Sequence, residues 1–181
     1  MASPQPAPQV KLFAAVLHAP EADPADCLRR LEGAFSPCEH RGVARAFDCT
    51  DYYAEEMGPA LLRSIVGFRD LQPASALPQA KQRANAIESE LARHGRRRFN
   101  IDVGYLDLHK VVLASCKGRG SKVYLHDGVW ADVTLRYRAG RWEPLPWSFP
   151  DFRDGRYDVD FLHLRALLKA QLRLISAPDA D

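Results

Sequence analysis

At 181 residues, of which 46% are hydrophobic, the chain is long enough to bury one substantial core. Its 25 basic and 23 acidic residues nearly balance, which excludes a protein that binds nucleic acid or membranes through overall positive charge. No apolar run approaches the roughly 20 residues of a membrane span, and MASPQPAPQ lacks the features of a signal peptide. We expect a cytoplasmic protein with a disordered tail over 1–9, a single α+β domain over 10–175 and a short tail over 176–181.

The first half of the chain alternates between strand-like and helix-like segments. VKLFAAVLHAP predicts a central strand, and DPADCLRRLEGAF predicts a helix with Asp23 as its N-cap. EHRGVARAFDCT and LLRSIVGFRDL predict two strands, LPQAKQRANAIESELARH a long helix, and RRFNIDVG another strand. This order predicts a ferredoxin-like βαββαβ half, with an antiparallel sheet and helices on one face.

More sheet is expected after this half. The Val-Val-Leu centre of YLDLHKVVLASCK favours a strand, although the spacing of Leu106, Lys110 and Leu113 also permits a short helix. PLPWSFPDF is a proline-rich loop, and DVDFLHLRALLKAQLRLI predicts a C-terminal helix. The expected fold is therefore α+β, with the ferredoxin-like half extended by an antiparallel hairpin sheet and this last helix.

The dipeptide Asp127-Gly128 predicts a type I′ hairpin inside SKVYLHDGVWADVTLRYRAGRWEPL. A two-residue turn at this position sets Tyr124 opposite Ala131. Strand alternation then predicts one core face and one polar face. The core face carries Val129, Ala131, Val133, Leu135 and Tyr137, and the polar face carries Trp130, Asp132, Thr134 and Arg136.

Distinctive motifs run from the first strand to the last helix: VKLF, TDYYAEEMGP, the trio Lys81, Asn85 and Glu88, NIDVGYL, KVVLAS, YLHDGVWADVTL and PWSFPDF. In these motifs the chain resembles a family of bacterial proteins, the domain of unknown function 4416. Members often carry the label GTP-binding protein, and the residues allow that label to be tested. A P-loop needs GxxxxGK followed by Ser or Thr. CKGRGSKVYL has these residue types in the wrong order, so the sequence does not support a P-loop.

The trio Lys81, Asn85 and Glu88 is spaced i, i+4, i+7 and lies on one face of the predicted helix. One interpretation is a solvated face with a weak intrahelical pair. The other is a binding face in which Glu88 is catalytic and the other two contact a ligand. Exposed charged faces are the common case, and the family motif makes the two interpretations about equal.

The segment NIDVG offers Asn100 and Asp102 at a strand. An Asx turn with Gly104 explains these residue types without any ligand. Alternatively, Asp102 is a general base or ligates a divalent ion, and Asn100 orients it. The sequence leaves both interpretations open.

Lysines on the predicted strands offer a cationic site, and Lys110 is the strongest candidate because it interrupts LHKVVL, where a charge is costly unless it is paired. Lys117 and Arg97 are further anion contacts, and Asp132 beside Thr134 offers oxygen ligands for a divalent ion. The alternative is a mixed-charge face that discourages edge pairing between sheets.

The loop TDYYAEEMGP adds Tyr52, Tyr53 and Glu56, which offer aromatic stacking and a carboxylate. Loop tyrosines also commonly cover a core. No HxxxH, CxxC or nucleophile-elbow spacing is present, so no metal ligands are assigned and the corresponding hydrolase types are not expected.

These residues favour a site that binds, or turns over, a phosphorylated or nucleotide-like small molecule. Whether the protein is an enzyme is left open, and so is its oligomeric state. The assigned residues are, for the anion, Lys110, Lys117 and Arg97; for a proton or a divalent ion such as Mg²⁺, Asp102, Glu88 and Asp132; and for a ring, Tyr53. The alternative is a non-catalytic module that binds RNA or protein, which a net charge of only +2 disfavours.

Overall fold

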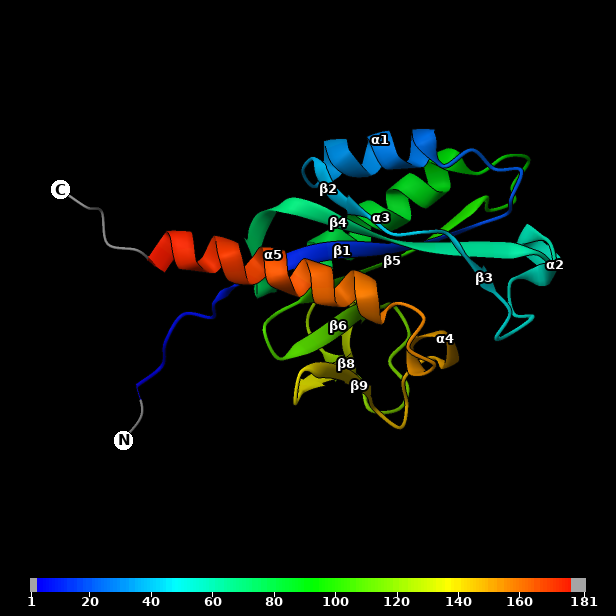
Figure 1. Ribbon diagram of the computed structural model, residues 1–181. Helices are drawn as coiled ribbons and strands as arrows, with labels where there is room; N and C mark the ends of the chain where they lie inside the picture. The colour runs from blue at the N-terminus through cyan, green and yellow to red at the C-terminus, as the bar shows by residue number, and fades with distance from the viewer. Residues whose placement is uncertain (1–2, 177–181) are drawn as a thin grey trace.

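The computed structural model describes residues 3–176, which form an α+β fold around one antiparallel sheet (Figure 1). The strands are β1 (Gln9–His18), β2 (Cys38–Arg41), β3 (Arg45–Phe47), β4 (Leu61–Pro73), β5 (Phe99–Leu106), β6 (Lys110–Ser115), β7 (Val123–Tyr124), β8 (Trp130–Arg138) and β9 (Arg141–Pro144). The helices are α1 (Ala25–Ala34), α2 (Ala54–Met57), α3 (Leu77–Leu91), α4 (Pro150–Arg153) and α5 (Asp158–Ser176), with a 3₁₀ turn, η1 (Ala74–Ala76).

The strands follow the order β2-β4-β1-β5-β6-β8-β7, while β3 pairs with β4 and β9 pairs with β8. Helices α1 and α3 cover one face of the sheet and α5 crosses the other (Figure 1). The predicted α+β class with an antiparallel sheet is confirmed. Two details differ, because the strand predicted over EHRGVARAFDCT is split into β2 and β3, and the loop TDYYAEEMGP contains the short helix α2.

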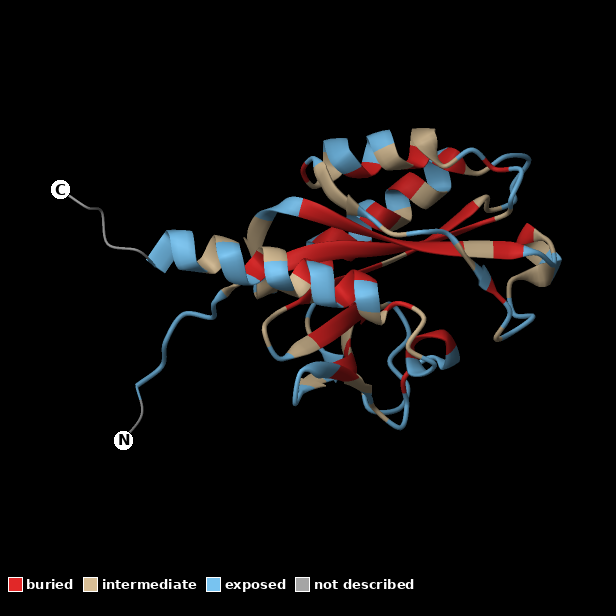
Figure 2. Cartoon of the chain, in the orientation of Figure 1, coloured by how far each residue is buried: buried red, intermediate tan, exposed pale blue. Residues whose placement is uncertain are grey.

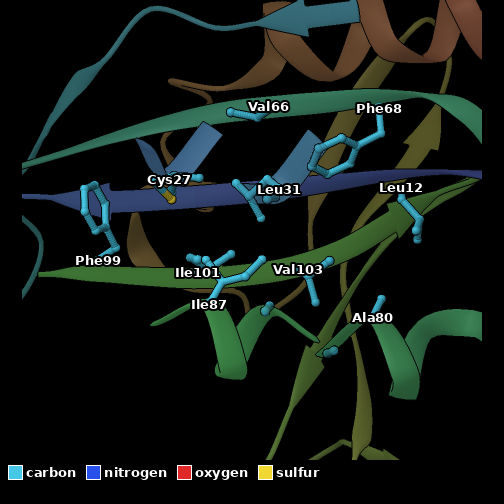
Figure 3. Close-up of a cluster of buried hydrophobic side chains, with 14 of the residues drawn as sticks. Leu12, Cys27, Leu31, Val66, Phe68, Ala80, Ile87, Phe99, Ile101 and Val103 are labelled. Atoms are coloured by element: carbon cyan, nitrogen blue, oxygen red, sulfur yellow. The ribbon is translucent and has the colours of Figure 1, made fainter. Parts of the chain in front are cut away.

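Strand β1 is buried on both faces because a helical layer lies on each side of it (Figure 2). Leu12 and Val16 point into the core beneath α1 and α3, part of which Figure 3 shows. Phe13 and Ala15 point into the core beneath α5. This arrangement explains why the first strand is an uninterrupted apolar run and does not alternate. Within residues 3–176, no helix is both long and apolar enough to cross a membrane.

The predicted hairpin register is wrong by one residue. Tyr124 pairs with Trp130, because the amide of Leu125 donates to the carbonyl of Val129 and leaves an extra residue in the turn. Positive φ angles at Asp127 (53°) and Gly128 (74°) still match the turn that the dipeptide predicts.

The predicted division of β8 into one core face and one polar face is also wrong. The pairing of β8 with β6 shifts register between Val111 and Val112, so that Val133 lies on the α3 side of the sheet and Leu135 on the α5 side. A bulge of this kind adds one residue to a strand, so the side chains beyond it point to the opposite face from the one that simple alternation predicts. Thr134 and Asp132, predicted on a polar face, are buried.

Residues 110–115 form a strand, so the favoured prediction for YLDLHKVVLASCK is confirmed and the helical alternative is wrong. Strands β5 and β6 lie close together at Gly104, which is opposite Leu113. A Cβ atom at this position lies 2.4 Å from the carbonyl oxygen of Val112 and 2.8 Å from the ring of Phe13. Only glycine fits there without moving the backbone.

Replacing Gly104 by alanine is expected to lower the free energy of unfolding by about 2 kcal/mol, because the new methyl group forces β5 and β6 apart. Gly33 in α1 is the matched control, since a Cβ atom there has nothing within 4 Å. Gly33→Ala is expected to raise the free energy of unfolding by about 0.5 kcal/mol. Urea denaturation measures both values, and an equal effect of the two substitutions would contradict the close contact.

Candidate functional site

Strands β5 and β6 pair only where Gly104–Leu106 meets Val111–Leu113, and beyond this region they diverge. The peptide of the buried residue Ile101 therefore lacks a partner on β6. Two side chains of α3 replace that strand: Glu88 Oε1 accepts from the amide of Ile101 at 2.6 Å, and Lys81 Nζ donates to its carbonyl at 3.0 Å. Lys81 and Glu88 can do this together because residues seven apart share one helix face.

All three members of the helical trio lie at this divergence. Asn85, between the other two on α3, donates from Nδ2 to Cys116 Sγ at 3.5 Å. Lys81 is only 7% exposed, which excludes a solvated face as the explanation of its position. Burial raises the pKa of Glu88, although Lys81 and the amide of Ile101 favour its ionised form.

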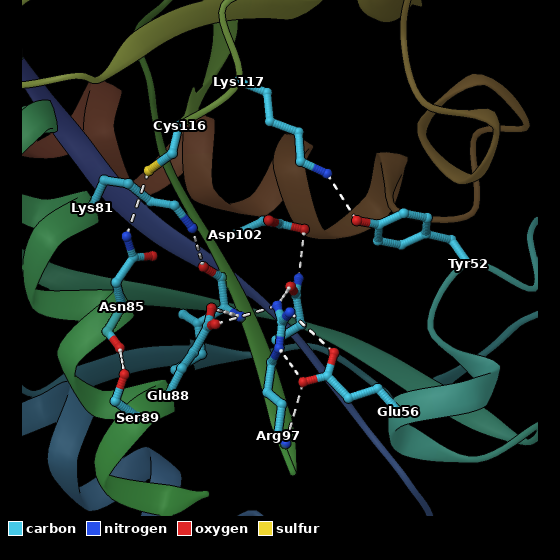
Figure 4. Close-up of polar contacts among 12 residues, drawn as sticks. Tyr52, Glu56, Lys81, Asn85, Glu88, Ser89, Arg97, Asp102, Cys116 and Lys117 are labelled. Carbon is cyan, nitrogen blue, oxygen red and sulfur yellow. Dashed lines mark hydrogen bonds and ion pairs between the residues drawn. The ribbon is translucent and has the colours of Figure 1, made fainter. Parts of the chain in front are cut away.

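Arg97 joins the trio to the loop that carries Glu56. It donates from Nε and Nη2 to the two oxygens of Glu56, at 3.3 and 3.1 Å. Its Nη1 lies 2.8 Å from Asn100 Oδ1 and 3.5 Å from Glu88 Oε2. Figure 4 shows this network around β5, with the α3 side chains on one side and Glu56 on the other. Arg97, predicted to contact an anion, thus already binds two carboxylates of the protein.

The network continues on the α5 face of the sheet through Asp102. Oδ2 of Asp102 accepts from Asn100 Nδ2 and from Arg63 Nη2, both at 3.1 Å. Buried Arg63 also donates to Asp151 at 2.6 Å, and Tyr157 donates to the same carboxylate oxygen at 3.3 Å.

Arg63, Asp151 and Tyr157 were missed by the sequence-based assignment. A signal for Arg63 existed, because it interrupts the apolar run LLRSIVGF as Lys110 interrupts LHKVVL. Asp151 lies in the motif PWSFPDF, whose most distinctive residues are aromatic.

The tyrosines of the loop TDYYAEEMGP differ in exposure. Tyr52 is 66% exposed, and its hydroxyl accepts from Lys117 Nζ at 3.0 Å, while the same ammonium lies 4.7 Å from the ring centroid. This hydrogen bond lowers the pKa of Tyr52. Tyr53 packs instead against Phe47 in a small core, and burial raises its pKa to about 12. Tyr52 is therefore the ring that a ligand can reach.

Lys110 lies apart from this cluster. Its ammonium pairs with Asp107, and its strand position is opposite Arg136. Because neighbouring Val111 pairs with Leu106, four residues from Asp102 along β5, the separation is roughly 13 Å along the sheet.

Asp132 and Thr134 also lie outside the network around Ile101. The hydroxyl of Thr134 donates to the carbonyl of Val111 at 3.3 Å, and Asp132 faces Lys122 across 3.9 Å. In the described part of the chain, no three His, Cys, Asp or Glu side chains are grouped so as to hold a metal ion. Two surface hollows, one near Phe35 and Arg83 and one between α1 and β2, are lined by none of the predicted site residues.

The chain matches a family model over most of its length. Residues 8–167 match the family described as Domain of unknown function (DUF4416). The chain belongs to this family. The match includes every residue of the network, from Glu56 to Tyr157. No curated protein and no solved structure matches the chain.

Replacing Glu88 by alanine is expected to lower the free energy of unfolding by about 2 kcal/mol, because the buried amide of Ile101 loses its acceptor. Glu88→Gln retains a side-chain oxygen and should lose less. Glu90→Ala is the matched control on α3, since exposed Glu90 only pairs with exposed Arg30 at the surface, and it should change stability by no more than about 0.5 kcal/mol. If urea denaturation gives Glu88→Ala and Glu90→Ala the same free energy of unfolding, Glu88 does not stabilise the fold as the acceptor for the amide of Ile101.

Proposed function

We propose that the divergence between β5 and β6 binds the anionic group of a phosphorylated or nucleotide-like small molecule. Lys81 carries the argument. Its ammonium is buried, donates to one carbonyl oxygen, and has no carboxylate within 4 Å among residues 3–176. A buried charge is costly unless it is closely paired, and Glu88 attracts this ammonium only from beyond 4 Å. In this proposal an anion from outside the chain supplies the close partner.

Lys117 is the second cation of the proposed anion site. Asn85 lies one helical turn from Lys81 and contacts Cys116, so the loop carrying Lys117 begins close to Lys81. Over the described residues, Lys117 contacts an uncharged phenol and forms no ion pair. Its ammonium is therefore free to exchange the hydroxyl of Tyr52 for a phosphate oxygen at little electrostatic cost.

The remaining side chains take other roles in this proposal. Asn85 offers amide hydrogen bonds beside the anion, and the exposed ring of Tyr52 offers a stacking surface for a base or sugar. Asp102 retains partial exposure on the other side of β5 and is the carboxylate that a reacting hydroxyl would meet. Arg97 and Glu88 hold the strands and the loop in place.

We also infer that the first half of the chain is ferredoxin-like. The strand order β2-β4-β1-β5 with α1 and α3 on one face supports this inference, since it is the order that a βαββαβ unit produces. Such a sheet leaves its other face free, and here α5 covers that face while β6, β8 and β7 extend the sheet beyond β5.

Replacing Lys117 by alanine is expected to weaken binding of AMP and of inorganic phosphate at least about tenfold, because one charge-assisted hydrogen bond is lost. Lys110→Ala is the control: it removes a strand lysine that already pairs with Asp107 and should leave both affinities unchanged. Isothermal titration calorimetry measures the affinities, and thermal unfolding verifies that both variants are folded.

The proposal fails if neither ligand binds the native chain, or if Lys110→Ala weakens binding as much as Lys117→Ala. Salt-sensitive binding of single-stranded RNA that Lys117→Ala abolishes, without binding of AMP, would replace the small molecule by an RNA ligand.

A further inference from the structure

Asp132 is a buried carboxylate with an unused oxygen. The residue is 4% exposed, and its Oδ1 atom has no hydrogen-bond partner among residues 3–176. Its other oxygen lies 3.9 Å from Lys122 Nζ, beyond hydrogen-bond distance. Burial raises the pKa of Asp132 because desolvation of the carboxylate outweighs the attraction of Lys122. The missing partner is therefore a hydrogen-bond donor.

Asp132 lies on the same sheet face as Asp102. It is opposite Leu113 on β6, which is opposite Gly104 on β5, two residues from Asp102. Two interstrand spacings and two residues along the strand separate the carboxylates by on the order of 12 Å.

Ser115 connects the two ends of this span. Its hydroxyl accepts from the amide of Lys117 at 3.1 Å and from Lys122 Nζ at 2.9 Å. Both Lys117 and Lys122, which bound this loop, are therefore hydrogen-bonded to Ser115, the last residue of β6. Lys117 Nζ contacts Tyr52, which the proposed function assigns to the ligand, and Lys122 Nζ lies 3.9 Å from Asp132. Ser115 therefore links the lysine of the proposed anion site to the lysine beside Asp132.

We propose that Asp132 is a second subsite of the same ligand, where Oδ1 accepts a hydrogen bond from a ligand hydroxyl. This inference rests on the proposed function and narrows it, because the ligand then carries a phosphate at one end and a sugar-like hydroxyl at the other. Inorganic phosphate is too short to occupy both subsites, and a second phosphate is repelled by the carboxylate.

Lys122, whose side chain is 15% exposed, is the more accessible member of its pair with Asp132. Trp130 borders the same loop, since a Cβ atom on Gly118 lies 2.4 Å from its ring. A sugar ring entering beside Lys122 can use its hydroxyl groups both as donor to Asp132 and as acceptor from Lys122. A purely apolar group satisfies neither.

Calorimetric titration of the full chain with inorganic phosphate and with ribose 5-phosphate tests the subsite. Asp132→Leu removes the acceptor at similar volume and is expected to weaken ribose 5-phosphate about tenfold while leaving inorganic phosphate unchanged. Asp132→Asn keeps one oxygen and should lose less. Lys117→Ala is expected to weaken the binding of both ligands. This difference from Asp132→Leu distinguishes the anion site from the subsite at Asp132.

The subsite is overturned if Asp132→Leu leaves the ratio of the two affinities as in the native chain, even where Lys117→Ala weakens both. If Asp132→Leu keeps that native ratio and is more stable than the native chain, the partner of Oδ1 is a buried water molecule and not a ligand hydroxyl. Failure of both ligands to bind the native chain overturns the proposed function, and the subsite with it. If Asp132→Leu does not fold, the ratio of the two ligand affinities is compared between Asp132→Asn and the native chain, and an unchanged ratio overturns the subsite.

Discussion

The peptide group of Ile101 is the constraint on which the candidate site depends. It is buried, so its amide and carbonyl must be hydrogen-bonded, and β6 has already diverged from β5 at this position. Lys81 and Glu88 meet that requirement from α3. Charged side chains are thereby placed inside the molecule for a structural reason, and their charges then have to be balanced.

Part of that balance comes from a chain of alternating charges through the sheet. Glu88 attracts Arg97, which reaches Asn100, and Asn100 donates to Asp102. Asp102 then pairs with Arg63, which also binds Asp151. The chain connects α3, β5, β4 and α4, so the motif PWSFPDF is coupled to NIDVGYL through one buried guanidinium.

Local spacing explains what the sequence predicted well. The i, i+4, i+7 trio and the pair Asn100 and Asp102 lie together, because helix and strand periodicity place each set on one side of its element. The bulge in β8 could not be predicted from alternation, which assumes an uninterrupted strand. Lys110 and Arg63 show the same limit. Both residues interrupt apolar runs. Lys110 nevertheless pairs with Asp107 outside the network, whereas Arg63 is buried and pairs with Asp151 within it. Only long-range pairing distinguishes them.

Two buried lysines differ in the acceptors that the chain provides: Lys11 has a carboxylate partner, and Lys81 has none within 4 Å among residues 3–176. Lys11 is fully buried, and it has a carboxylate partner in Glu39 as well as the carbonyls of Phe68 and Arg69 at 3.2 and 3.3 Å. Even so, desolvation lowers the pKa of Lys11. Lys81 has a single carbonyl and no carboxylate within 4 Å among residues 3–176. Lys11 thus has three acceptors and Lys81 has one, and this difference is the reason that the proposed anion site is centred on Lys81.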